Sequence, residues 1–223
     1  MAIFALSDLH LPLGINKPMD VFGYRWDNYV EKIEYEWKRI VKEEDFVIIN
    51  GDFSWATYLS EALNDFKFIE ALPGKKLLSK GNHDYWWETL TKMNEFLSEN
   101  DIKSVTFMQN NAILCDGVAV CGAKGWISPN DNAFKKEDEK IYRRELIRLE
   151  ASLKEASTLS DTIIAALHFP PDSKYMEVIG RYNVERCVFG HLHGKRADDY
   201  IVSSPKCTLV SADYLKFAPI RII

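Results

Sequence analysis

An α/β fold is predicted by the way strand-like and helix-like segments alternate along the first half of the chain. Short apolar runs bounded by turn residues are typical of buried strands, and the stretches between them, with apolar residues three and four apart, are typical of amphipathic helices. The chain has 223 residues, of which 47% are hydrophobic and 27% charged. This composition is ordinary for a globular protein with a sizeable core. We therefore expect a single α/β domain over residues 1–223.

The first strands and helices follow from apolar runs and apolar periodicity. Strands are expected at residues 3–6, 46–49, 76–78 and 163–167 because each apolar run there is short and stops at a turn or a polar residue. Helices are expected at residues 27–41, 58–71 and 85–97, where apolar residues recur at helical spacing.

From residue 104 onward the pattern changes to shorter strands joined by tight turns. Strands are expected at residues 105–108, 112–114 and 118–121, with Asp116-Gly117 at a hairpin position, which predicts an antiparallel portion. Residues 134–157 interleave charges of both signs and predict an amphipathic helix that covers a sheet. Short strands near residues 200–202, 207–210 and 220–222 complete the expected elements.

Two segments are expected to form long loops. They are residues 11–26 and residues 124–133, and both follow predicted strands. Proteins of the α/β class commonly place their binding and catalytic groups on loops in this position.

Charge and cysteine usage restrict the possible partners and compartment. The formal net charge is -5 and no basic run is present, which argues against nucleic acid or an anionic membrane as a partner. The N-terminal apolar stretch is too short for a signal peptide, and no uncharged run reaches membrane length. The four cysteines lie apart without a C-x-x-C pair, so we expect a reduced, cytoplasmic protein.

The five histidines of the chain all fall in short motifs that follow strand-like runs. Taken singly, each motif is weak, because an acidic or amide side chain at a strand end often just caps a turn or a helix. No histidine is left over for the core or the surface, and imidazole and carboxylate groups together suit transition metals. The motifs are Asp8-Leu9-His10, Gly51-Asp52, Gly81-Asn82-His83-Asp84, His168 and Gly190-His191-Leu192-His193.

In order and form these motifs resemble the calcineurin-like metallophosphoesterase superfamily. The resemblance spans Asp8 to His193 and implies a four-layer αββα sandwich with two mixed central sheets and a dinuclear metal site at the strand ends. It implies two metal ions, manganese, iron or zinc, and a metal-bridging hydroxide as the nucleophile. The implied ligands are Asp8, His10 and His193 for the first metal, Asn82, His168 and His191 for the second, and Asp52 as the bridge between the two.

The resemblance also implies a role for the remaining histidine. His83 would face the leaving group as a general acid or stabilise transition-state charge. Asp84 either accepts a hydrogen bond from the His83 ring or caps the helix that follows. In the protein phosphatases of this superfamily an arginine follows the G-D motif, whereas Phe53 follows Asp52 here. The phosphoprotein phosphatase branch is therefore disfavoured, and Lys124, Arg25 and backbone N–H groups are left as alternative phosphate contacts.

The predicted activity is metal-dependent hydrolysis of a phosphomonoester or phosphodiester of a small-molecule or nucleotide-like substrate. A nuclease and a non-catalytic metal-binding scaffold are the alternatives. The acidic charge argues against the first, and the retention of every ligand and of His83 argues against the second. Tryptophans near the motifs and in the long loops could pack in the core or form an aromatic wall for a substrate. They are Trp26, Trp55, Trp86, Trp87 and Trp126.

Overall fold

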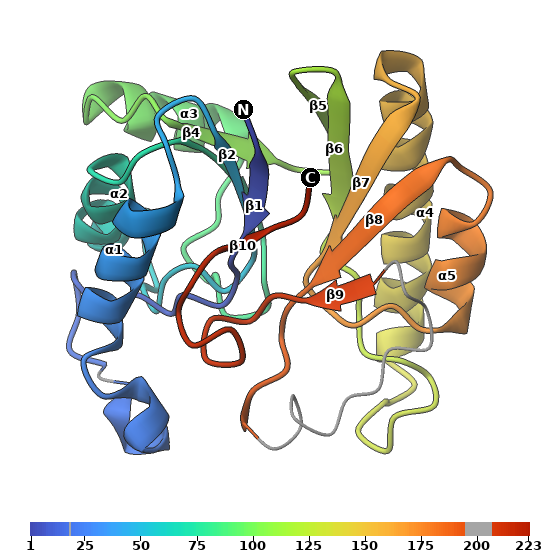
Figure 1. The fold of residues 1–223 in the computed structure, drawn as a ribbon. Coiled ribbons are helices and arrows are strands. Elements are labelled where there is room, and N and C mark those ends of the chain that lie inside the picture. The colour runs from blue at the N-terminus through green and yellow to red at the C-terminus, as the bar shows by residue number, and fades with distance from the viewer. Residues whose placement is uncertain (18, 195–206) are drawn as a thin grey trace.

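Two mixed β-sheets pack face to face, and helices cover the outer side of each (Figure 1). The computed structural model describes residues 1–17, 19–194 and 207–223. The first sheet has the strand order β10-β1-β2-β3-β4, and the second has the order β5-β6-β7-β8-β9. This arrangement is the four-layer αββα sandwich expected from the motifs.

The strands and helices are short, apart from the long helix α4. The strands are β1 (Ile3–Ala5), β2 (Phe46–Asn50), β3 (Lys75–Ser79), β4 (Val105–Met108), β5 (Ala112–Cys115), β6 (Val118–Ala123), β7 (Thr162–Leu167), β8 (Val184–Phe189), β9 (Cys207–Leu209) and β10 (Ile220–Arg221). The helices are α1 (Tyr29–Ile40), α2 (Leu63–Glu70), α3 (Leu90–Glu99), α4 (Asp138–Leu159) and α5 (Ser173–Ile179), with 3₁₀ turns at Asp20–Phe22, Tyr24–Trp26 and Leu59–Ala62.

Three apolar layers hold the four structural layers together. Side chains alternate between the two faces of a strand, so Ile3 and Ala5 of β1 point to the layer between the sheets, while Phe4 points to the layer under the helices. Helix α1 buries Tyr29 and Trp37, which lie on one face at helical spacing. Helices α1, α2 and α3 cover the first sheet, and α4 and α5 cover the second (Figure 1).

The antiparallel portion predicted from residue 104 onward is only partly correct. Strands β5 and β6 form the expected antiparallel hairpin, and Asp116 and Gly117 both have positive φ, as a two-residue hairpin turn requires. Strand β4, however, pairs parallel with β3 in the first sheet, and β6 pairs parallel with β7 in the second. A hairpin turn is encoded locally, whereas the switch from one sheet to the other depends on packing between distant segments.

Two predicted helix starts need correction, and one helix was not predicted. Helix α3 begins at Leu90 instead of residue 85, because Thr89 accepts a hydrogen bond from the Lys92 N–H group and caps it there. Helix α4 begins at Asp138, four residues later than expected. Helix α5 was not predicted, although Asp172 caps its first turn through two backbone N–H groups.

The strand expected near residues 200–202 lies outside the described residues. Among the described helices, none combines the length and the apolar character that crossing a bilayer requires.

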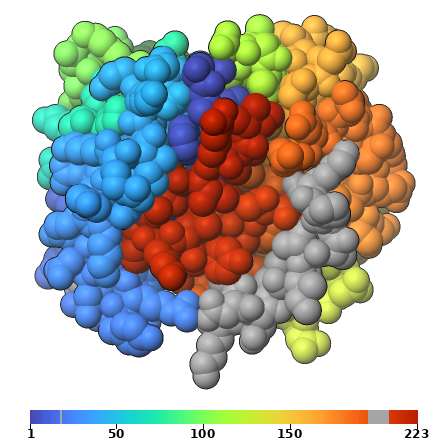
Figure 2. All heavy atoms as spheres, viewed as in Figure 1, coloured from blue at the N-terminus to red at the C-terminus, as the bar shows by residue number. Residues whose placement is uncertain are grey.

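All the predicted metal-binding motifs follow parallel strands whose carboxyl ends meet at one edge of the sandwich. Strands β1, β2 and β3 are parallel neighbours in the first sheet, and β7 and β8 are parallel neighbours in the second. The C-terminal segment, defined as residues 207–223, pairs with β8 through β9 and with β1 through β10. Figure 2 shows this segment, in red, filling the surface between the two halves.

Candidate metal centre

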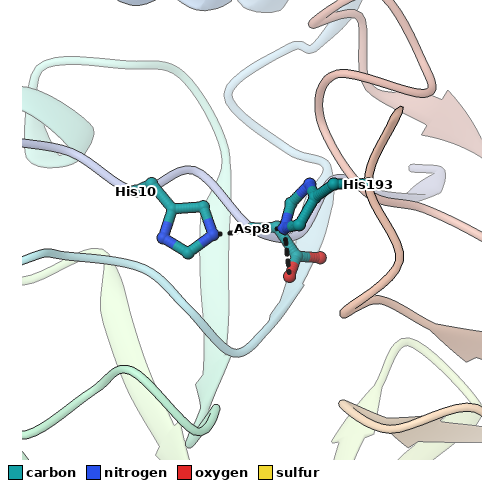
Figure 3. Close-up of side chains that lie close together, drawn as sticks. All are labelled: Asp8, His10 and His193. Atoms are coloured by element: carbon teal, nitrogen blue, oxygen red, sulfur yellow. Dashed lines mark hydrogen bonds and ion pairs between the residues drawn. The ribbon is translucent and has the colours of Figure 1, made fainter. Parts of the chain in front are cut away.

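The first cluster of potential ligands joins the end of β1 to the loop after β8. Asp8, His10 and His193 each offer one ligand atom, and these atoms lie within 4.8 Å of one another. The Nε2 atoms of His10 and His193 are 3.3 Å apart, and His193 Nε2 is 3.7 Å from Asp8 Oδ1. Figure 3 shows the two rings and the carboxylate converging on one point. The cluster therefore has the form of a three-ligand metal site.

The spacing of the two imidazole nitrogens fits a shared metal ion. Two nitrogen ligands at the usual 2.0–2.1 Å from a tetrahedral ion are separated by roughly 3.3–3.4 Å. The observed separation of 3.3 Å between His10 Nε2 and His193 Nε2 agrees with this value. The separation is therefore compatible with one cation held between the two rings.

The second cluster joins the ends of β2, β3, β7 and β8. Asp52, His168 and His191 place ligand atoms within 4.8 Å of one another. Asn82 belongs to the same group, because its Oδ1 atom lies 2.7 Å from His168 Nε2. The structure thus brings together, in two adjacent groups, all seven residues that the sequence proposed as ligands.

Asp52 lies between the two clusters. Its Oδ2 atom is 3.4 Å from His168 Nε2 and 3.8 Å from His10 Nε2. Its Oδ1 atom accepts a hydrogen bond of 2.8 Å from the His83 backbone N–H. Of the two carboxylate oxygens, Oδ2 is therefore the one that faces both clusters.

Hydrogen bonds from the far side of two rings fix which nitrogen faces the centre. His168 Nδ1 lies 3.1 Å from the Asn50 carbonyl oxygen, and His193 Nδ1 lies 2.8 Å from Asp213 Oδ1. Both acceptors require a proton on Nδ1, which leaves the Nε2 lone pair directed at the cluster. This is the tautomer that a metal ligand needs.

Two glycines allow the backbone to approach the carboxylates closely. A Cβ atom on Gly190 would lie 2.2 Å from Asp8 Oδ2, and one on Gly81 would lie 2.1 Å from Asp52 Oδ1. Any larger residue would therefore displace a carboxylate. The glycines of these motifs are required by this contact as well as by the turns that they make.

The backbone is strained at several proposed ligands. Asp8, His10, Asp52 and His191 have φ values of 57°, 46°, 51° and 70°. Residues other than glycine adopt this left-handed conformation infrequently, and such strain is concentrated at functional sites. Here it turns four side chains from three strand ends toward the two clusters.

Burial and opposite charge determine the pKa values in the second cluster. Burial alone would raise the pKa of Asp52, but the facing His168 ring holds it well below its usual range. Burial alone would lower the pKa of His168, but the Asp52 carboxylate raises it to about 9. A proton held between these two groups occupies the position of a cation, and metal binding would release it.

Asp84 does neither of the two things expected of it from sequence. It is fully buried, and its carboxylate accepts hydrogen bonds from the backbone N–H groups of Asp52 at 2.9 Å, Phe53 at 3.0 Å and Gly81 at 2.7 Å. Its Oδ1 atom also accepts from Trp86 Nε1 at 3.0 Å. Among the described contacts none joins it to the His83 ring. Asp84 instead fixes the two loops that carry Asp52 and Asn82.

His83 lies at the open side of the first cluster. Its ring is 5.8 Å from the His10 ring and 4.8 Å from the Trp55 ring, measured between centroids. Burial lowers the pKa of His83 below its usual value. Among the described hydrogen bonds, only its backbone N–H joins it to a proposed ligand, Asp52, and the imidazole lines the cavity where a substrate could reach it.

The motifs, their order and their convergence at one sheet edge match a known family. The family model for calcineurin-like phosphoesterases matches residues 1–195. The chain belongs to the calcineurin-like phosphoesterase family. This membership indicates metal-dependent hydrolysis of a phosphoester, and the two ligand clusters agree with the two metal ions that the family typically binds.

Solved structures also resemble this phosphoesterase, at low sequence identity. A protein of unknown function from Aquifex aeolicus has a TM-score of 0.50 and 16% identity, over 99% of this chain and 95% of that chain. The phosphopantetheinyl hydrolase of Mycobacterium tuberculosis has a TM-score of 0.48 and 14% identity, over 86% of this chain and 83% of that chain. The first likeness supports the fold alone. No curated protein matches the chain.

The sequence argument missed two polar residues in the C-terminal segment, outside the family match. Asp213 accepts hydrogen bonds from His193 Nδ1 at 2.8 Å and from the Gly194 N–H at 3.0 Å. Ser211 Oγ donates to Asp8 Oδ2 at 3.0 Å. A signal was present, because Ser211 and Asp213 follow an apolar strand just as Asp8 and Asp52 do.

The aromatic and cationic candidates from the sequence separate into two groups. Trp86 and Trp87 pack in the core between the first sheet and its helices. Trp26 belongs to the same core but, like Trp55, also lines a cavity beside the first cluster, and Trp126 lines another beside His191. The two predicted loops, residues 11–26 and 124–133, each supply part of one cavity wall. Arg25 lines the first cavity, and Lys124 lies over the Trp126 ring, 4.0 Å from its centroid.

Proposed function

We propose that this protein is a dinuclear metallophosphoesterase that hydrolyses a phosphomonoester or phosphodiester of a small-molecule or nucleotide-like substrate. One observation carries the proposal. The Asp52 Oδ2 atom lies between two ligand clusters, 3.8 Å from His10 Nε2 and 3.4 Å from His168 Nε2. A single carboxylate oxygen in this position can hold two cations close together.

Each residue near the centre has a distinct task in this proposal. Asp8, His10 and His193 hold the first ion, Asn82, His168 and His191 hold the second, and Asp52 is shared. This mixture of carboxylate, amide and imidazole donors suits manganese, iron or zinc. Asn50 at the end of β2 supports the second site from across the sandwich, because its carbonyl oxygen faces His168 Nδ1 and its amide donates to the Leu167 carbonyl.

When bound, two divalent cations in a site of this kind lower the pKa of a water molecule and neutralise charge on the transferring phosphoryl group. The chain itself supplies the remaining functions. His83 lies within the open cavity and donates a hydrogen bond or a proton to the leaving oxygen. Asp84 holds the Asp52 loop and Gly81 in place, so that Asp52 and Asn82 keep their positions.

The test is hydrolysis by purified protein loaded separately with manganese, iron or zinc. p-Nitrophenyl phosphate and bis(p-nitrophenyl) phosphate, compared at one metal concentration, separate monoesterase from diesterase activity. We expect turnover of at least one ester and two bound ions per chain. Two ions per chain without turnover across a broad panel of phosphoesters would favour a binding scaffold. Steeply salt-dependent cleavage of DNA or RNA would favour a nuclease.

A further inference from the structure

A cavity with aromatic walls opens beside His83, on the side of the first cluster. Its volume is ≈ 380 Å³, and its lining includes His10, Met19, Phe22, Trp26, Trp55 and His83. Cavities of this size commonly bind small organic groups. The cavity therefore provides room for a substituent attached to a phosphoryl group at the metal centre.

The ring planes of this wall are held in fixed positions. Trp55 stacks on His10, with 4.6 Å between centroids and 23° between planes. Trp26 meets the edge of His10 at 6.0 Å and of His193 at 5.7 Å. The Trp55 indole N–H donates to Met19 Sδ at 2.9 Å, which fixes the rotation of that ring. A rigid wall of this kind favours flat groups over flexible ones.

The aromatic part of this wall offers little hydrogen bonding to a polar ligand, although Arg25 and His83 also line the cavity. The Trp55 N–H is engaged by Met19, and the nearby Asp213 carboxylate is engaged by His193 and Gly194. Against the indole rings themselves, a polyhydroxylated group such as a sugar would lose hydrogen bonds to water and recover few. An aromatic ring loses none, and it gains contact with the aromatic side chains that line the cavity.

Exposed apolar side chains at the mouth of the cavity extend the same surface. Phe22, which lines the cavity, is 67% exposed, and its neighbours Val21 and Tyr24 are 73% and 82% exposed. Large apolar side chains that gather on a surface indicate a binding site more often than isolated ones do. Substrate covering Phe22 would remove this apolar surface from water.

The position of His83 identifies which part of the substrate enters this cavity. His83 lines it, whereas the cavity beside His191 includes Phe169 and the acidic side chain of Asp172. The group that assists departure of the leaving oxygen must lie on the leaving-group side of the phosphorus atom. The aromatic cavity is therefore on the leaving-group side.

We propose that the physiological substrate is a phosphoester whose leaving alcohol carries a planar aromatic or heteroaromatic ring, which binds between Trp26, Trp55 and Phe22. The inference rests on the proposed function. In the reaction, a water oxygen bonds to phosphorus and the phosphorus–oxygen bond to the alcohol breaks. The leaving oxygen gains a proton, so that one ester and one water give one phosphate product and one alcohol.

Binding is tested first, because it needs no turnover. Manganese-loaded protein is titrated calorimetrically with 2-naphthylmethylphosphonate and with methylphosphonate. We expect the naphthyl compound to bind at least tenfold more tightly, and Phe22→Ala to reduce that ratio about tenfold, as expected for loss of one aromatic contact. The control is Tyr35→Ala, which removes an aromatic ring that is also 67% exposed but does not line the cavity. It should leave the ratio unchanged.

Kinetics then tests the same selectivity in catalysis. The quantity measured is the ratio of kcat/KM for 2-naphthylmethyl phosphate to kcat/KM for glycerol 1-phosphate. Both substrates are esters of primary alcohols. If the enzyme prefers diesters, the methyl diesters of the same two compounds replace them. We expect a ratio well above one that falls in Phe22→Ala. Equal binding of the two phosphonates, or ratios unaffected by Phe22→Ala, would overturn the aromatic-substrate proposal. Failure to hydrolyse any ester while the naphthyl compound still binds selectively would instead contradict the proposed function.

Discussion

Replacing Asp213 should weaken the first metal site without unfolding the chain. Asp213 is 6% exposed and accepts the His193 ring N–H at 2.8 Å and the Gly194 N–H at 3.0 Å. Asp213→Ala removes both acceptors, so the His193 ring loses the partner that fixes its tautomer and orientation. Asp213→Asn keeps an acceptor for the ring but cannot also accept from Gly194, and it carries no charge.

The expected loss follows from what such a carboxylate contributes. Burial alone would lower the pKa of His193, but Asp213 raises it above its usual value, which shows that the carboxylate makes the ring more basic. Removal of a carboxylate behind a metal-bound histidine typically costs about 10-fold to 100-fold in metal affinity. This range corresponds to about 1.4–2.7 kcal/mol. We expect the loss of metal affinity in Asp213→Ala to fall within this range and the loss in Asp213→Asn to be smaller.

The assay is manganese binding by calorimetry or chelator competition, with elemental analysis of bound metal. Asp45→Ala is a matched control, because Asp45 is 5% exposed and accepts backbone N–H groups from Ala2 at 2.7 Å and Lys42 at 2.9 Å. Asp45 precedes β2, at the opposite end of that strand from Asp52. The Asp45→Ala substitution should lower the free energy of unfolding while the affinity for metal stays constant. A folded Asp213→Ala protein with unchanged affinity for both ions would refute the reasoning.

Four further predictions concern other positions. His83→Ala should slow turnover by roughly 10² to 10⁴ while two ions stay bound, since its ring contacts no proposed ligand by hydrogen bond; metal analysis that shows ion loss would contradict this. Asp52→Asn should weaken both ions together in a calorimetric titration, and loss of only one would exclude the bridging position. Gly190→Ala should reduce bound metal, measured by elemental analysis, because the new Cβ would lie 2.2 Å from Asp8 Oδ2; full occupancy would show that the loop can move aside. Burial raises the pKa of Asp65 to about 7 from 3.8, so the folded state binds the extra proton and stability should fall as pH rises from about 4 to 7, by up to about 4 kcal/mol. In Asp65→Asn the free energy of unfolding, measured with urea, should differ less between pH 5 and pH 8. An unchanged difference would argue against a raised pKa of Asp65.

The proposed ligand set could be predicted because strand ends are visible in sequence. Asp8, Asp52 and His168 each follow an apolar run, and parallel strands bring their carboxyl ends to the same edge. The assignment of β4 to the first sheet could not be predicted in this way. Residues 105–108 have the same local pattern in either sheet, and only packing against β3 decides the choice.

The role of Asp84 shows a second limit of sequence reasoning. The motif places Asp84 next to His83 in the chain, but neighbouring side chains can point in opposite directions. The Asp84 carboxylate points into the protein toward the Asp52 loop, while His83 lines the cavity. Helix α3 begins later than predicted in the same region, because the chain makes a turn at residues 85–86 and is irregular up to residue 89, with Trp86 and Trp87 buried.

The hydrogen bond from Ser211 to Asp8 has a consequence for how the protein is made. It joins residues 203 positions apart, so at about 5–20 residues per second the ribosome needs about 10–40 s to add the second partner after the first. Throughout that interval Asp8 lacks the Ser211 hydroxyl, and His193, once added, still lacks Asp213. Metal loading should therefore follow completion of the chain. Nascent chains that stop before residue 207 would retain every family motif but lack the groups that hold two of the proposed ligands in place.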